Sequence, residues 1–532
     1  MNYNRQHEDF RGDKIYFAME GKSLKLKNIL LSRIVIAGSI ILLQIVWFIT
    51  FFLRLTEYSI IINFFFTTLS IIALLFVINK RYNPAFKLAW SILILLFPLF
   101  GGLLYAMLGT KEPLRKMSTS IENTKNAILP FVNQKEEILL AIKENDKHAY
   151  GQVKYILEHS NSPIYTNTET KYYRSGEENF PDILEALKSA KHFIFLEYFI
   201  IANGRMWNEV LEVLKEKAAQ GVDVRVMYDD VGSLTTLPYK YYKYIESFGI
   251  KCEAFNHFVP FFSVVMNNRD HRKILVIDGH TGFTGGINLA DEYINEKNRF
   301  GYWKDTGIML KGEAVWNLTV MFLTMWNAVR KTDTTYEAFM PKAHNKLEFN
   351  DDGYVQPYGD SPLDGETVGE NVYLNIINNA VDYVYIFTPY LIIDNEMMVA
   401  LCLAAKRGVD VRIVTPNIPD KKIVFLLTQS FYPQLIENGV KIYQFTPGFL
   451  HAKCFVSDDK VATVGTINMD YRSLYLHFEC GVFLYNTKTV LEVRDDILNT
   501  IEQSRRISEE DLNSSFIKRF AQAVLILFAP LL

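Results

Sequence analysis

Two stretches of the chain carry the same polar residues at the same spacing. The first runs from 271 to 288 (HRKILVIDGHTGFTGGIN) and the second from 451 to 468 (HAKCFVSDDKVATVGTIN). In each, a His is followed two residues later by Lys, five later still by Asp, then seven by Gly and three by Asn. A single His beside a strand is more often structural than chemical. Agreement at five positions is not expected by chance, so the repeat predicts a duplicated functional unit.

The residue types in this repeat suit phosphoryl transfer. Two imidazoles supply a nucleophile and a general acid or base that work near neutral pH. Two ammonium groups neutralise a phosphate, and two carboxamides donate hydrogen bonds to its oxygens. The candidates for these roles are His271, His451, Lys273, Lys453, Asn288 and Asn468. Such a site needs no metal or other cofactor, and a Lys two residues from each His disfavours a cation site.

An Asp closes each strand of the repeat. Asp278 and Asp458 complete the predicted catalytic set with the His and Lys residues. Because each follows its strand directly, it can instead pair locally with a Lys or cap the turn. We favour this structural role over a chemical one.

Short buried strands are expected to position these side chains. The apolar residues between Lys and Asp predict a strand, and period two places the His and Lys of one copy on the same face. Glycines such as Gly285 and Gly465 let the following backbone come close to an anion. Each copy offers one His at the repeated position, whereas phosphodiester exchange needs a nucleophile and an acid opposed in line. We therefore expect a single site at the interface between two halves.

Helices and strands alternate on both sides of each motif. In the first half a helix at 183–190 leads to an apolar strand at 193–201, then to another helix and another strand. The second half repeats this order from residue 371. The alternation predicts an α/β fold of two pseudo-symmetric halves, with mostly parallel or mixed sheets flanked by helices.

At the repeated motifs the sequence resembles the phospholipase D superfamily, whose signature is a duplicated His-x-Lys-x-x-x-x-Asp followed by a Gly-rich turn and Asn. The resemblance covers nearly the whole chain from about residue 80. Flanking segments are similar to those of bacterial cardiolipin synthases: FIFLEYFII (193–201), VRVMYDDVGS (224–233), GGINLADEY (285–293), YWKDTG (302–307), IFTPYLI (386–392), GVDVRIVTP (408–416) and GTINMDYRS (465–473).

This resemblance implies roles for individual residues. It implies one active site in which the two motifs face each other, with His271 as nucleophile and His451 as acid. It also implies that Asp305 and Glu479, which follow the motifs, each hydrogen-bond a motif His and fix its tautomer. The synthase pattern usually reads Asn-Phe-Glu where this chain has His-Phe-Glu, so no role carries over to His477.

Apolar runs near the N-terminus predict a membrane region. The runs at 34–53 and 59–79 are each long enough to cross about 30 Å of hydrocarbon. A third run, at 88–108, carries Pro98 and two glycines at its middle, so it either spans or re-enters. A cleaved signal peptide is disfavoured because the charged lead is long and no small-residue cleavage site follows.

Basic residues bear on the orientation of this membrane region. Lys and Arg in residues 1–33 favour an inside start. A re-entrant third run would keep the catalytic part inside, whereas three full spans would place it outside. We favour a multi-pass protein of the cell membrane with its catalytic part on the cytoplasmic face.

These features divide the chain into six expected parts. They are a basic segment (1–33), a membrane region (34–110), a charged linker or helical segment (111–165), a first phospholipase-D-like half (166–345), a second half (346–510) and an apolar C-terminal helix (511–532). The C-terminal helix is short and interrupted by Pro, so docking on the catalytic part or lying in the membrane interface is favoured over spanning.

Composition excludes some classes of function. The net charge of -3 and the pI of about 6.4 give no electrostatic case for nucleic acid as a partner. The four Cys show no metal-ligand spacing, and a disulfide framework is disfavoured. Protein partners are not indicated.

The residues alone support phosphoryl transfer beside a bilayer. The resemblance implies a phosphatidyltransferase that converts two phosphatidylglycerol molecules to cardiolipin and glycerol through a phosphatidyl-histidine, at an anionic lipid bilayer. A hydrolytic phospholipase D is the alternative of the same class. A catalytically inactive lipid-binding membrane protein is the alternative of a different class, and a membrane-tethered nuclease is disfavoured by the acidic pI.

Overall fold

The computed structural model describes residues 60–80, 83–96, 115–258, 267–344, 348–350, 353–513 and 515–531, with scattered positions at 42–54, 102 and 105. The chain divides into two compact units. The first comprises residues 1–80, 90–110 and 258–266, and the second comprises residues 81–89, 111–257 and 267–532. Both repeated motifs belong to the second unit.

Helix α4 (Ile60–Asn79) is the longest described element of the first unit. It coincides with the second predicted apolar run, and it exposes large apolar side chains such as Phe64 and Leu75. Within the described part of the chain, no helix is both long and apolar enough to cross a membrane. The run at 34–53 lies mostly outside the described residues, as does the middle of the run at 88–108. The predicted spans therefore stay predictions.

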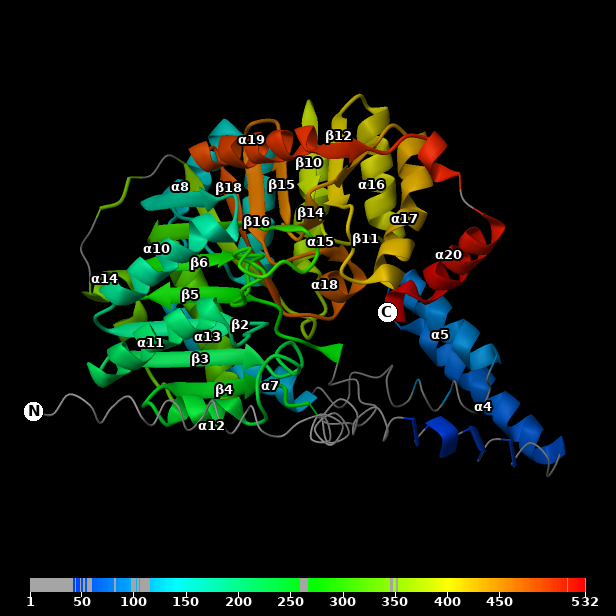
Figure 1. Cartoon of the computed structure of the whole chain (residues 1–532), viewed down its shortest axis with the longest axis horizontal. Helices are drawn as coiled ribbons and strands as arrows, with labels where there is room; N and C mark the ends of the chain where they lie inside the picture. The colour runs from blue at the N-terminus through cyan, green and yellow to red at the C-terminus, as the bar shows by residue number, and fades with distance from the viewer. Residues whose placement is uncertain are drawn as a thin grey trace, which may run out of the picture. The chain divides into compact units, whose positions relative to one another are not determined.

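A seven-stranded sheet forms the first half of the second unit (Figure 1). Its strands are β1 (Thr168–Tyr173), β2 (Phe193–Tyr198), β3 (Asp223–Asp229), β4 (Lys251–Phe255), β5 (Lys273–Ile277), β6 (Thr281–Gly285) and β8 (Gly307–Gly312). Their spatial order is β1-β8-β6-β5-β2-β3-β4. Strands β2, β3 and β4 are parallel neighbours, and the other neighbours are antiparallel.

The second half repeats this sheet strand for strand. Its strands are β9 (Tyr354–Asp360), β10 (Tyr383–Phe387), β12 (Asp410–Pro416), β13 (Lys441–Phe445), β15 (Cys454–Ser457), β16 (Val461–Gly465), β18 (Glu479–Tyr485) and β19 (Ser504–Arg506). The order β9-β18-β16-β15-β10-β12-β13 matches the first sheet, and β19 is added at the edge.

The predicted α/β fold of two pseudo-symmetric halves is confirmed, and the sheets are mixed. Mostly parallel pairing, which the alternation of helices and strands also allowed, is wrong. Strands β5 and β6 are joined by a turn at 278–280, and a connection this short permits only antiparallel neighbours. The motif strands are central in both sheets, so the residues at their ends are held by neighbours on both sides.

Helices cover both sheets. In the first half they are α10 (Gly176–Ser189), α11 (Arg205–Ala219), α12 (Tyr241–Glu246) and α13 (Val315–Val329). In the second half they are α15 (Val368–Asn379), α16 (Asn395–Lys406), α17 (Lys422–Glu437) and α19 (Lys488–Glu502). Helix α13 packs on its own sheet and on β9 of the other half, while α19 packs on its own sheet and on β1. The two helices therefore tie the halves together.

Buried polar contacts also cross between the halves. The Tyr172 hydroxyl donates to Asp496 at 2.8 Å, and the hydroxyls of Thr170 and Thr489 lie 2.7 Å apart. These groups are buried together with one continuous apolar cluster that draws on both sheets. Because a buried polar group is costly to leave unpaired, such contacts fix one arrangement of the halves.

The predicted linker at 111–165 is helical and packed. It forms α7 (Arg115–Ile128), α8 (Glu136–Asn145) and α9 (Lys147–Ser160). Ile142, Val153 and Ile156 are fully buried in a cluster shared with the second sheet. The buried residues of α8 and α9 recur at helical spacing, which lets this charged segment pack on the second sheet.

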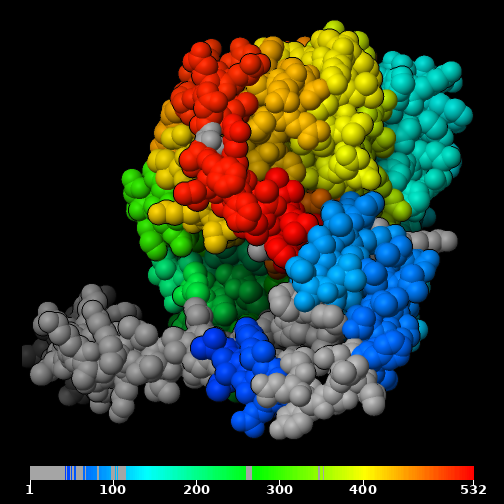
Figure 2. Space-filling view, turned by 90° about the vertical axis from the view of Figure 1, so that its right-hand side faces the viewer, coloured from blue at the N-terminus to red at the C-terminus, as the bar shows by residue number. Residues whose placement is uncertain are grey.

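Helix α20 (Phe516–Phe528) docks on α17, which is one of the two alternatives expected for the C-terminal segment (Figure 2). The Gln522 side chain donates to the Leu426 carbonyl at 3.1 Å. The opposite face of α20 exposes Phe516, Ile517 and Phe520. The helix therefore contacts the catalytic unit with one face and presents an apolar face outward.

Candidate active site

Short backbone pairings bring the two motifs to the interface between the halves. Strand β14 (Gly448–Leu450), just before His451, lies parallel to β7 (Tyr302–Lys304) of the first half. A matching bridge joins Asp270, just before His271, to Phe478 of the second half. The pairings have the same pattern, so the two motif histidines occupy equivalent positions.

The backbone amide of each motif His donates a hydrogen bond to a carbonyl of the opposite half. The His271 amide donates to the Phe478 carbonyl at 2.9 Å, and the His451 amide donates to the Lys304 carbonyl at 2.7 Å. The residue after each of these carbonyls is an acid, Glu479 or Asp305. One half therefore supplies a His while the other supplies the group that positions it.

The two His–acid pairs cross between the halves. His271 Nδ1 lies 2.9 and 3.0 Å from the two Glu479 oxygens, and His451 Nδ1 lies 2.7 Å from Asp305 Oδ2. Both carboxylates are fully buried. A carboxylate that accepts from Nδ1 keeps the proton there and leaves the Nε2 lone pair for chemistry. This is the geometry that the predicted orienting role requires.

The motif lysines are buried beside the histidines. Lys273 Nζ donates to the His271 carbonyl at 2.5 Å, and Lys453 Nζ donates to the His451 carbonyl. Burial lowers the pKa of Lys273 to about 7 and that of Lys453 to about 8, although Glu479 and Asp305 both act to raise these values. An anion in the site would favour the charged form of both lysines.

Both imidazoles are held in the neutral form at pH 7. Burial and the charge of Lys453 lower the pKa of His451 to about 4, while Asp305 acts to raise it. Burial lowers the pKa of His271 well below its ordinary value, and the charges of Lys273 and Lys453 lower it further. A neutral imidazole is the form that can attack phosphorus.

The two predicted phosphate-binding amides differ in their surroundings. Asn288 accepts from the Ile200 amide at 3.0 Å and donates to the Tyr293 hydroxyl at 2.7 Å. The Asn468 backbone amide donates to Ser473 Oγ at 3.1 Å, and its buried side-chain oxygen has no hydrogen-bond partner among the described residues. Protein groups thus hold both the oxygen and the nitrogen of the Asn288 side chain, whereas none of the described residues holds the Asn468 side-chain oxygen.

Asp278 and Asp458 lie at the far ends of the motif strands from the lysines. Asp278 accepts from the backbone amides of residues 191, 192 and 193, and Asp458 accepts from those of residues 381, 382 and 383. Each carboxylate therefore caps the start of the neighbouring strand, β2 or β10. These contacts support the structural role that the sequence favours, and we propose that role for both residues in place of a catalytic one.

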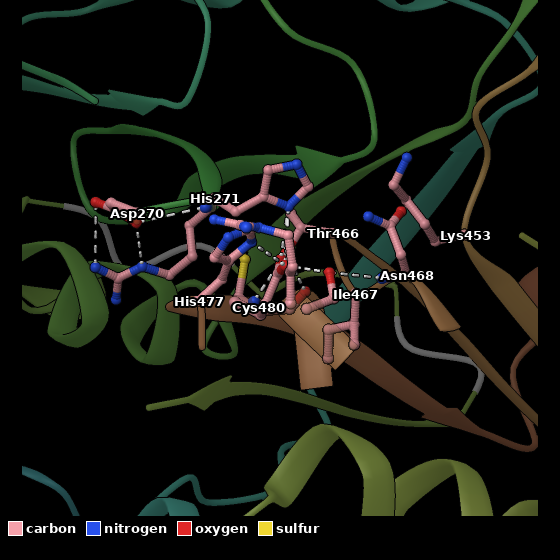
Figure 3. A network of polar contacts seen from close by, with 12 residues as sticks. Asp270, His271, Lys453, Thr466, Ile467, Asn468, His477 and Cys480 are labelled. Atoms are coloured by element: carbon pink, nitrogen blue, oxygen red, sulfur yellow. Dashed lines mark hydrogen bonds and ion pairs between the residues drawn. The ribbon is translucent and has the colours of Figure 1, made fainter. Parts of the chain in front are cut away.

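Three further residues surround Glu479 that the sequence did not assign to the site (Figure 3). The hydroxyls of Thr466 and Ser473 each donate to the carboxylate at 2.5 Å. His477 Nδ1 lies 3.8 Å from Glu479 Oε1. Thr466 and Ser473 lie in the segment GTINMDYRS, which the family resemblance already singles out. Their role could not be predicted from it, because a hydroxyl can be assigned to the site only once its partner, Glu479, is known.

Comparisons with known proteins agree with this geometry. The family model described as "Cardiolipin synthase, PLD-like domain" matches residues 183–315 and 373–501, and the one described as "Phospholipase_D-nuclease N-terminal" matches residues 68–109. Each match of the first model contains one His–Lys motif. The duplication is therefore a duplication of this domain.

Similar proteins cover most of the chain. An uncharacterised protein of Streptococcus mutans is 46% identical over 86% of this chain and 99% of its own length. A cardiolipin synthase of Halalkalibacterium halodurans is 35% identical over 85% of this chain and 90% of its own length. A crystal structure of a Haemophilus influenzae phosphatidylserine synthase covers 71% of this chain and 97% of its own, with a TM-score of 0.51 and 17% identity. That likeness concerns the fold alone.

The identity, the coverage and both domain matches point the same way as the crossed His–acid pairs. The resemblance seen in the motifs and their flanking segments is confirmed. The chain belongs to the cardiolipin synthase family of proteins with phospholipase-D-like domains.

Proposed function

We propose that the chain is a membrane-associated cardiolipin synthase that converts two phosphatidylglycerol molecules to cardiolipin and glycerol. The observation that carries the proposal is the pair of crossed contacts, His271 with Glu479 and His451 with Asp305. They build one site with two imidazoles from halves that each supply only one motif His. Relatives named cardiolipin synthase support phospholipids as substrates.

In the first step His271 Nε2 attacks the phosphorus of one phosphatidylglycerol. The phosphorus–nitrogen bond forms as the bond to the glycerol headgroup oxygen breaks, and His451 gives that oxygen its proton. His451 is neutral in the free site, so it must first take a proton from solvent, and the bound phosphate anion favours this by raising its proton affinity. The products of this step are glycerol and a phosphatidyl-histidine.

In the second step the terminal hydroxyl of a second phosphatidylglycerol opens the intermediate. His451 removes the hydroxyl proton, the oxygen bonds to phosphorus, and the bond to His271 Nε2 breaks. Charge on the phosphoryl oxygens is offset by Lys273 and Lys453, with amide donors from Asn288 and Asn468. These groups are already assembled around the histidines, so little reorganisation is needed.

Two surfaces support association with a membrane. Helix α4 exposes a series of large apolar side chains, and α20 exposes Phe516 and Phe520 beside Lys518 and Arg519. A helix with an apolar face next to basic residues binds the interface of an anionic bilayer. We also propose that the chain crosses the membrane more than once and that its catalytic part lies on the cytoplasmic face.

Asn83 and Phe86 contact the segment of the second unit that follows Asn468. The Asn83 side chain donates to Asp394 at 2.9 Å and to the Tyr475 hydroxyl at 2.8 Å, and Phe86 packs edge-on against Tyr471. Tyr471 and Tyr475 belong to α18 (Tyr471–Tyr475), which begins three residues after Asn468. This contact supports delivery of lipid close to the site.

Product analysis tests the activity. Full-length protein is incubated with phosphatidylglycerol in mixed micelles, and lipid and water-soluble products are identified. Cardiolipin and glycerol in equal amounts support the proposal. Phosphatidic acid alone would show a hydrolase, and no product would favour an inactive lipid-binding protein. His148→Asn, at an exposed position of α9, is the matched control for removal of a His.

Thiol labelling tests the orientation. All four native cysteines are buried, so a Val381→Cys variant adds one exposed thiol to the second half. A membrane-impermeant maleimide added to intact cells should leave this thiol unlabelled and should label it after lysis. Labelling in intact cells would place the catalytic unit outside.

A further inference from the structure

A third imidazole lies beside the His271–Glu479 pair. The ring centroids of His271 and His477 are 5.6 Å apart, and His477 Nδ1 is 3.8 Å from Glu479 Oε1. Figure 3 shows the His477 and His271 side chains on the same side of the polar network. The mechanism proposed above gives His477 no task.

The surroundings of His477 leave its ring nitrogens without partners. Both nitrogens are buried, and neither has a hydrogen-bond partner among the residues that the structure describes. A buried polar atom without a partner is costly, so native structures rarely keep one unless a water, an ion or another ligand satisfies it. Here two such atoms border a carboxylate and a second imidazole.

The three side chains have the composition and spacing of a transition-metal site. One ligand atom each from His271, His477 and Glu479 can be chosen so that all lie within 4.8 Å of one another. In a tetrahedral zinc site, ligand atoms are about 3.3 Å apart. The His271–Glu479 contact of 2.9 Å must open slightly and His477 must approach, which are small side-chain movements.

The charges of the site select the class of metal. Glu479 supplies one negative charge, whereas Lys273 and Lys453 oppose any cation. Magnesium and calcium prefer oxygen ligands and would find one carboxylate facing two ammonium groups. Zinc and its neighbours in the first transition row bind imidazole strongly, so two histidines can hold them there.

We propose that His271, His477 and Glu479 bind a divalent transition metal of the zinc class, and that the bound ion inhibits the enzyme. The ion takes the Nδ1 lone pair of His271, and the neutral imidazole then carries its single proton on Nε2. That nitrogen has no lone pair left to attack phosphorus. The binding site stands on the geometry alone, whereas inhibition rests on the proposed function.

Among the described residues, the His451 side of the site has no equivalent cluster. Trp303 occupies the position that matches His477, two residues before the acid, and its ring lies 5.5 Å from His451. An indole nitrogen is a donor only and cannot ligate a cation. Metal binding is therefore expected at His271 and not at His451.

Cobalt absorption tests the site without reference to activity. Full-length protein in detergent, without an oligohistidine tag, is titrated with Co²⁺ and followed by its visible absorption. We expect one ion per chain with the intense bands of tetrahedral Co²⁺, displaced by Zn²⁺. His477→Asn should weaken binding by more than about tenfold, and the exposed-His control His148→Asn should leave it unchanged.

Several outcomes would overturn the site. They are no one-to-one complex in the unaltered protein, an unchanged complex in His477→Asn, and a loss in His148→Asn of the same size. Thermal unfolding shows whether His477→Asn is folded, and His477→Gln takes its place if it is not. The titration of the unaltered protein decides the matter even if both variants fail to fold.

Lipid turnover tests inhibition separately. Zn²⁺ at the concentration that saturates the cobalt site should stop cardiolipin formation by the unaltered protein and leave His477→Asn active. A saturated site without loss of turnover would overturn the inhibition. If no preparation turns over lipid even with a chelator present, the proposed function fails, while the cobalt spectra still decide the site.

Discussion

The surroundings of the two motif histidines are equivalent in backbone and different in chemistry. Around His451 stand the rings of Tyr293, Trp303 and Phe449, with centroids 5.5 to 5.8 Å away. Around His271 stand one phenyl ring, a second imidazole and an acid that also receives two hydroxyl groups. The two copies therefore share the backbone geometry of the motif His but differ in the polarity of the side chains around it.

This difference assigns different tasks to the two histidines. Asp305 lies 2.7 Å from His451 Nδ1 and also accepts from the Thr306 amide, whereas Glu479 contacts His271 and accepts from two hydroxyls, those of Thr466 and Ser473. Asp305 accordingly acts to raise the pKa of His451, while the pKa of His271 is lowered well below its ordinary value by burial and by the lysines. The contact with Asp305 favours a proton on His451, which suits the proton-transfer role proposed for it.

Removing one His at a time has the largest expected effect and tests whether there is one site or two. His271→Asn and His451→Asn should each lower cardiolipin formation by at least about 10⁴-fold, because both imidazoles serve the same phosphorus. Initial rates in mixed micelles provide the measurement. Two independent sites would instead leave roughly half of the activity in each variant, and the comparison above would lose its meaning.

Replacing each acid by its amide tests whether the two His–acid pairs contribute differently to kcat. Asp305→Asn and Glu479→Gln keep the shape of the side chain but withdraw the charge that holds the Nδ1 proton, and similar changes elsewhere cost about 10²–10⁴-fold in kcat. We expect the larger loss for Asp305→Asn, since Asp305 acts on the His that must gain and lose a proton. A larger loss for Glu479→Gln would reverse the roles of the two halves.

In the expected pH profile of kcat/KM, the lysines determine the alkaline limb and the histidines determine the acid limb. Lys273 and Lys453 lose their charge as pH rises through about 7 and about 8 in the free enzyme, so kcat/KM should fall over that range. The histidines have lowered pKa values, so the acid limb should lie well below the ordinary range of His. A profile of kcat/KM against pH checks both limbs. An alkaline limb that begins only near pH 10 would show that the lysines keep ordinary pKa values.

Replacing the capping aspartates has the smallest expected effect. It compares the two halves at positions away from the histidines and lysines. Asp278→Ala removes the partner of three backbone amides at a buried position and should lower the free energy of unfolding by about 1–3 kcal/mol. Asp458→Ala should cost less, since two of its three bonds lie at an exposed position. Thermal unfolding measures both. Loss of turnover in a variant of unchanged stability would return these residues to the catalytic set.

The sequence predicted the motif residues because repetition of five positions is independent of the fold. It could not predict which acid serves which His, because Asp305 and Glu479 reach across to the opposite half through the pairings at β7 and Phe478. Helix–strand alternation left mostly parallel and mixed sheets open, because it does not reveal a turn as short as 278–280. His477 was visible as a departure from the family pattern, but its neighbour His271 lies two hundred and six positions away in the chain.

Mapping the covalent intermediate tests the central claim most directly. The full-length protein is mixed with phosphatidylglycerol, quenched rapidly in base, digested and analysed by mass spectrometry. The account predicts a phosphatidyl group on the peptide that contains His271 and none on the peptide that contains His451. An adduct on His451 would contradict it.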